Sequence, residues 1–98
     1  MGALRKYLGS LEGRPLKRFR YLGYYDDAKV FKSSDGDLVL IGEDLLDEAY
    51  RILGRNVEYL GPGADMPLFI KKKGSEEAVV IAPRTRDEYF SEERVVKD

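Results

Sequence analysis

The sequence predicts a single α+β domain in which a mainly antiparallel sheet carries two helices on one face. Two segments have apolar residues at helical spacing, and shorter segments between them alternate or run apolar as strands do. Turn signals between neighbouring strand segments indicate hairpins, whose strands are antiparallel. The expected order is α-β-β-β-α-β-β-β, and 98 residues suffice for one such domain.

The first helix is expected over residues 4–13. Leu4, Leu8 and Leu11 recur at i, i+4 and i+7, which places them on one face of a helix. Gly13 is expected to end this helix.

A strand is expected from residue 16 to residue 24. The chain alternates there, with Phe19 and Tyr21 on one side and Arg18 and Arg20 on the other. One face of the strand is therefore apolar and the other is basic.

Residues 28–33 and 37–42 are expected to form a hairpin. Between them, Ser34-Asp35-Gly36 is a turn signal, and the second segment is short and almost continuously apolar.

The second helix is expected over residues 43–54. Acidic residues crowd its first turns, where negative charge suits the helix dipole, and Gly54 is a natural C-terminal cap. Its apolar stripe comprises Leu45, Ala49, Ile52 and Leu53.

Three further strands are expected at residues 57–60, 68–73 and 78–82, the last two joined as a second hairpin. Residues 1–86 are predicted to form the domain. Residues 87–98 are mostly charged and are expected to be a loose tail or a short docking helix.

The composition lacks the side chains that most often perform chemistry. The chain has no His and no Cys, so neutral-pH acid–base or nucleophilic catalysis would depend on carboxylates, Lys or Tyr. We therefore expect a protein that is not an enzyme, with no catalytic residues, metal or cofactor. With no disulfide, no secretory signal and no membrane span predicted, a cytoplasmic location is expected. The absence of Gln and Trp, the single Asn and the many charges indicate a thermophilic source.

A carboxylate-dependent enzyme is the least favoured alternative. Asp26-Asp27 and Asp35-Gly36-Asp37 flank one strand, which at ~3.3 Å per residue separates the two pairs by roughly 20 Å. The pairs cannot converge on one metal ion through that strand.

Positive charge concentrates near the N-terminus. Residues 1–25 carry a net charge of +5 and the remainder carries −6. Cations interleaved with aromatic rings suit nucleic acid, so a DNA-associated or RNA-binding role is the alternative function. Its expected binding residues are Arg14, Lys17, Arg18 and Arg20. An ordinary strand with a charged outer face explains the same pattern.

The segment from residue 57 to residue 86 resembles the C-terminal end of the sliding clamps, the proliferating cell nuclear antigen family. The entry Gly63-Ala64-Asp65-Met66-Pro67-Leu68 leads into the last hairpin, which is followed by Ala82-Pro83-Arg84 and an acidic tail. The expected order of elements is also similar to one clamp domain. A clamp subunit has two or three such domains, and this chain has room for one.

The resemblance implies partner docking by Ala82, Pro83 and Arg84, with Met66 and Pro67 entering the outer sheet. It also implies assembly of subunits through sheet edges. The leading prediction is a non-enzymatic interaction or assembly module that is sliding-clamp-like. Its expected partners are further copies of the chain, as a homo-oligomer, or another protein.

Overall fold

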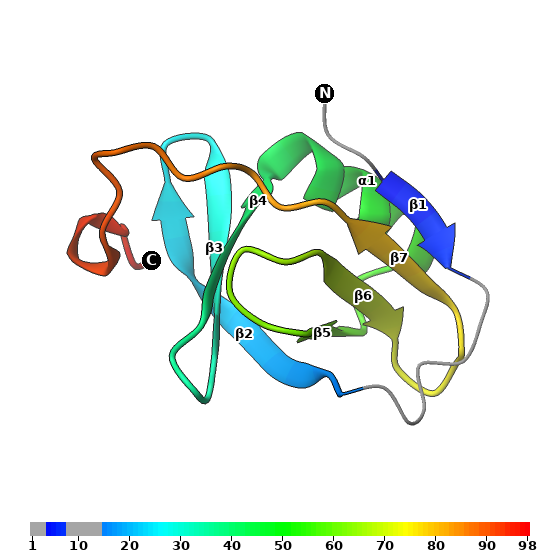
Figure 1. Ribbon diagram of the computed structural model, residues 1–98. Coiled ribbons are helices and arrows are strands. Elements are labelled where there is room, and N and C mark those ends of the chain that lie inside the picture. The colour runs from blue at the N-terminus through cyan, green and yellow to red at the C-terminus, as the bar shows by residue number, and fades with distance from the viewer. Residues whose placement is uncertain (1–3, 8–14) are drawn as a thin grey trace.

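The computed structural model describes residues 4–7 and 15–98, as one antiparallel sheet curled around one α-helix (Figure 1). The strands run in the spatial order β1-β7-β6-β5-β2-β3-β4, and each neighbouring pair is antiparallel. The elements are β1 (Leu4–Tyr7), β2 (Lys17–Tyr25), β3 (Ala28–Ser33), β4 (Leu38–Gly42), α1 (Glu43–Leu53), β5 (Val57–Gly61), β6 (Leu68–Lys72), β7 (Ala78–Ile81) and the 3-10 helix η1 (Glu92–Arg94).

The prediction of a helix over residues 4–13 is wrong where the structure describes it. Residues 4–7 form strand β1, which pairs with β7 from Leu4 opposite Ile81 to Tyr7 opposite Ala78. Residues 8–13 lie outside the described part. An isolated short helix is marginal in water, whereas β7 would otherwise expose a row of unpaired backbone groups. The described chain is therefore mainly β, with α1 as its single α-helix.

Helix α1 confirms the second helix prediction, but its buried face is rotated from the predicted one. Leu46, Ala49 and Leu53 are buried, whereas Ile52 is 38% exposed. Gly54 has φ +82° and donates its N–H to the Tyr50 carbonyl at 2.7 Å, which ends the helix.

The main core fills the space between α1 and the concave face of the curled sheet. Helix α1 contacts β4, β6 and β7, which lie at the two sides of the curl. The buried core residues come from α1 and from six strands: Phe19, Phe31, Val39, Ile41, Leu46, Ala49, Leu53, Val57, Leu68, Ile70, Val79 and Ile81.

A second core lies on the outer face of β3 and β4, under the C-terminal tail. Val95 is buried there against four sheet residues, and Phe90 packs beside it. Val96 joins the edge of β2 through two backbone hydrogen bonds with Tyr24, at 2.9 and 2.8 Å. Because both faces of β4 are covered, all five of its residues are buried. The sheet residues of this core are Ala28, Val30, Leu38 and Leu40.

The segment that follows β7 covers the open edge of β4, as its orange trace in Figure 1 shows. Arg84 donates its backbone N–H to the Leu40 carbonyl at 2.7 Å. The Leu38 carbonyl accepts the Asp65 N–H at 3.2 Å and the Arg86 guanidinium at 3.0 Å. These bonds connect the edge of β4 to the segments that precede β6 and follow β7, and they bring residues 82–86 beside the start of α1.

Candidate functional site

A hollow of about 670 Å³ lies between the start of α1 and the extended segment after β7. Its apolar surface comes from Leu45, Ala82 and Pro83, which are half-buried. Its other lining residues are Gly42, Asp44, Arg84 and Thr85, and we call the whole feature the α1 groove.

The guanidinium of Arg84 is fixed at one end of the α1 groove. Its Nη1 forms an ion pair with Asp27 Oδ1, on the turn between β2 and β3. A Cβ atom at Gly42 would lie 2.9 Å from Arg84 Nη2 and 3.2 Å from Asp44 Oδ1, so a residue without a side chain lets this group sit against the backbone. The close fit holds the segment after β7 against the helix.

Carboxylates gather on the same side of the groove. An adjoining hollow of about 380 Å³ is lined by Arg84 together with Asp27, Glu43, Asp44 and Asp47. Four carboxylates facing one guanidinium leave an excess of negative charge. The groove therefore combines an apolar floor with an acidic rim.

The partner-docking residues implied by the clamp resemblance do not all line the same hollow. Ala82, Pro83 and Arg84 line the α1 groove, whereas Met66 and Pro67 do not. Met66 is 47% exposed in the loop before β6. Asp65 of that loop lies at the groove's far side, where its Oδ1 accepts a hydrogen bond from Arg86 Nε at 2.7 Å.

Sequence reasoning missed the other wall of the groove. Gly42, Asp44 and Leu45 come from the junction of β4 and α1, about 40 residues before the other wall in the sequence. The only local signal was a glycine directly before an acidic helix start. Their pairing with residues 82–85 depends on the curl of the sheet.

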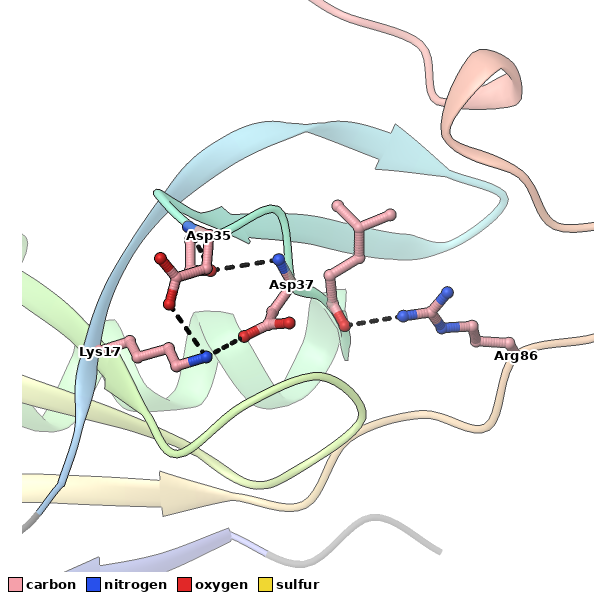
Figure 2. A network of polar contacts seen from close by, with 6 residues as sticks. Lys17, Asp35, Asp37 and Arg86 are labelled. Carbon is pink, nitrogen blue, oxygen red and sulfur yellow. Dashed lines mark hydrogen bonds and ion pairs between the residues drawn. The ribbon is translucent and has the colours of Figure 1, made fainter.

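Among the predicted nucleic-acid-binding residues, Lys17 forms ion pairs with the turn between β3 and β4. Figure 2 shows its ammonium between two carboxylates, at 2.6 Å from Asp37 and 3.1 Å from Asp35. The hydrogen bonds that Lys17 donates to Asp37 first, and then to Asp35, raise the pKa of Lys17. The buried Ser33 hydroxyl accepts the backbone N–H groups of the same two aspartates, which fixes the turn. Arg14 lies outside the described residues.

Arg18 and Arg20 remain on the outer surface of β2. The Arg18 side chain is 78% exposed and lies 3.4 Å from Glu58, and Arg20 is exposed and forms no ion pair with a described residue. Both line a hollow of about 360 Å³ with Lys32, which pairs with Glu92 at 2.6 Å.

Phe19 also lines the hollow beside Arg18 and Arg20, but its ring and that of Tyr21 belong to the opposite face of β2. Phe19 is buried in the main core, and the ring of Tyr21 packs against the core residue Phe31 with centroids 5.9 Å apart. The predicted separation of the basic and apolar faces of this strand is therefore confirmed, although Tyr21 is 40% exposed.

The carboxylate pairs considered for an enzyme lie on two different turns. Asp26 and Asp27 join β2 to β3, and Asp35 and Asp37 join β3 to β4. Across residues 4–7 and 15–98, no group of three or more acidic side chains is arranged to hold a metal ion. The same residues contain no helix that is long and apolar enough to cross a membrane.

In comparisons with known proteins, no protein-family model, curated protein or solved structure matches this chain. The likeness to sliding clamps stays a prediction.

Proposed function

We propose that this protein is a non-enzymatic interaction and assembly module that binds a partner in the α1 groove. The observation that carries the proposal is that Leu45, Ala82 and Pro83 line one hollow together with the charged residues Asp44 and Arg84. Small-molecule and peptide sites commonly combine an apolar surface with a few fixed polar groups. We place this role in the cytoplasm, which the absence of cysteine favours.

Both walls of the groove are anchored in the fold. Gly42 ends β4 and pairs with Ala28, while Arg84 bonds to the Leu40 backbone and to the Asp27 carboxylate. Walls that are already ordered reduce the entropy lost when a partner binds. This support favours a preformed site.

The backbone of the groove suits an extended partner. Residues 82–86 run past α1 without forming a helix or a strand (Figure 1), and Thr85 makes no backbone–backbone hydrogen bond to a described residue. An extended peptide can add to such an edge, with backbone hydrogen bonds giving affinity and side-chain pockets giving specificity. The clamp resemblance supports the same site, because it assigns docking to Ala82, Pro83 and Arg84 from the sequence, and a clamp-like role stays within this proposal.

A peptide selection against the full chain tests the proposal. Random peptides that bind the wild-type protein are expected to bind the variants Leu45→Glu and Thr85→Tyr at least ~10-fold more weakly, a change of about 1.4 kcal/mol. The first variant charges the groove floor, and the second fills the groove from an exposed position that leaves the core unchanged.

The matched control is Ile52→Glu, which introduces the same charge at an exposed apolar residue of the same helix outside the groove. Selected peptides should bind it as they bind the wild type. If no peptide is enriched, or if the enriched peptides bind all three variants equally, the proposed site is wrong.

Nucleic-acid binding is the second candidate function. The observation that favours it is the exposed pair Arg18 and Arg20, of which Arg20 lacks an ion pair among the described residues. We expect oligonucleotide affinity at low salt that falls steeply as salt is added and that is reduced by Arg18→Ala and Arg20→Ala. Fluorescence anisotropy that detects no binding at low salt would remove this candidate.

A further inference from the structure

The described surface has an acidic end and a basic end. The acidic end consists of Asp27, Glu43, Asp44 and Asp47, which surround Arg84 beside the α1 groove. The basic end consists of Arg18, Arg20 and Lys32. Glu58 and Glu92 partly balance the basic end, but Arg20 has no such partner among the described residues.

The two ends lie too far apart to neutralise each other within one copy. Arg18 stands at the start of β2, and Asp27 follows the end of the same nine-residue strand. Counted along the strand at ~3.3 Å per residue, these nine positions span roughly 30 Å, and the five positions from Asp27 to Lys32 along β3 span roughly 17 Å, in a molecule 36 Å long. Exposed charges are screened beyond about 8 Å at physiological salt, so the two ends act independently.

We propose that the partner in the α1 groove is a second copy of this chain, which inserts its basic end. This inference rests on the proposed function of the groove. The two surfaces differ, so the contact is head-to-tail, and it closes into a ring or continues as a filament according to the rotation between copies.

The chemistry of the groove matches an arginine side chain. Arginine can lay its apolar stem on a hydrophobic surface while its charged head reaches polar groups. Leu45, Ala82 and Pro83 offer the surface for the stem, and the carboxylates of the acidic end lie beside it. The exposed Arg20 is the side chain best placed to enter.

Arg84 does not block this contact. Its guanidinium is already paired with Asp27, which leaves Glu43, Asp44 and Asp47 to receive an incoming cation. Asp44 Oδ1 accepts the Leu45 N–H at 2.9 Å, and a carboxylate has lone pairs for further donors. The same acidic end would repel nucleic acid, so a protein surface fits the groove better.

A charge-exchange experiment on the full chain tests the inference. Arg20→Glu makes the basic end more acidic, and Asp47→Lys makes the acidic end more basic, both at exposed positions. By sedimentation velocity at low salt, wild-type protein should increase in mean mass with concentration and lose this increase as salt is added. Each variant alone should associate at least tenfold more weakly, because the substitution replaces an attraction across the contact with a repulsion.

An equimolar mixture of the two variants should regain association. The native acidic end of one variant faces the native basic end of the other, so the mixed pair contains one contact with the wild-type charges. The controls Lys73→Glu and Glu76→Lys make the same changes in net charge on the turn between β6 and β7, and they should associate as the wild type does.

Three results would overturn the inference: a wild-type protein that stays monomeric at high concentration and low salt, association that neither reversal weakens, or a mixture that does not recover. If the protein is monomeric but selected peptides still depend on Leu45 and Thr85, the inference fails and the proposed function stands. If Arg20→Glu weakens oligonucleotide binding without changing the mass, the basic end serves nucleic acid instead.

Discussion

Replacing Gly23 with alanine should release the C-terminal tail from the sheet. A Cβ atom at this position would lie 2.3 Å from the Val96 carbonyl oxygen and 2.9 Å from Val95 Cγ1. The first of these neighbours is backbone, which cannot rotate away as a flexible side chain can. The tail must therefore move off β2 in Gly23→Ala.

The magnitude follows from what the tail then loses. The two hydrogen bonds between Tyr24 and Val96 contribute about 1 kcal/mol each, and the buried Val95 side chain contributes about 1.5–3 kcal/mol. The conformational entropy that the freed tail regains offsets part of this loss. We expect the free energy of unfolding to fall by about 3 kcal/mol, from a total of about 5–15 kcal/mol for a domain.

Urea unfolding followed by circular dichroism measures this change, and limited trypsin digestion reports the tail directly. Cleavage after Arg94 should be faster in Gly23→Ala than in the wild type. The matched control is Gly63→Ala, where the nearest atom to the new Cβ lies 4.0 Å away, and it should change the free energy of unfolding by less than about 0.5 kcal/mol. A Gly23→Ala protein as stable as this control, with an equally protected tail, would refute the reasoning.

Three further predictions concern side chains in the core and at the tail. Phe31→Ala should lower the free energy of unfolding by about 3–5 kcal/mol in a urea titration, because the ring is fully buried; a loss below about 1 kcal/mol would contradict this. The hydrogen bond from Lys32 lowers the pKa of Glu92, so their pairing should stabilise the fold above the ordinary carboxyl pKa of about 4.3 and be lost as the pH falls through the lowered value. The stability difference between wild type and Lys32→Met should shrink on acidification, and a difference independent of pH would count against the pair. Burial and a hydrogen bond to Asp98 raise the pKa of Tyr21 to about 12. Tyr21→Phe should therefore remove a late step from the ultraviolet titration, and removal of a step near the ordinary value of about 10 would show the prediction to be wrong.

Local pattern predicted most elements of the sheet and the helix. The strand expected at residues 28–33 coincides with β3, and the helix expected over 43–54 ends one residue earlier in α1. The bounds agree because turn residues, a C-terminal glycine and acidic residues at a helix start act within a few positions of the chain. The alternation along β2 likewise separated the arginines from the buried Phe19.

The sequence predicts only one of the two walls of the α1 groove. The resemblance to sliding clamps points to Ala82, Pro83 and Arg84, but nothing near them in the sequence points to Gly42 and Leu45. The sequence predicts that Lys17 lies on a binding surface, whereas the structure pairs it with two aspartates of a turn. Ion pairs between residues about 20 positions apart leave no periodic trace in a sequence.

The sequence by itself determined the local elements, the hairpin turns, the acidic start of α1 and the absence of His and Cys. The tertiary structure alone decided that residues 4–7 are a strand, that Val95 is buried in a second core, and that residues 82–86 cover the edge of β4. The physical reason is the distance along the chain over which each interaction acts. Propensity and capping act between neighbours, whereas each of these three features satisfies backbone groups or apolar surface supplied by a distant segment.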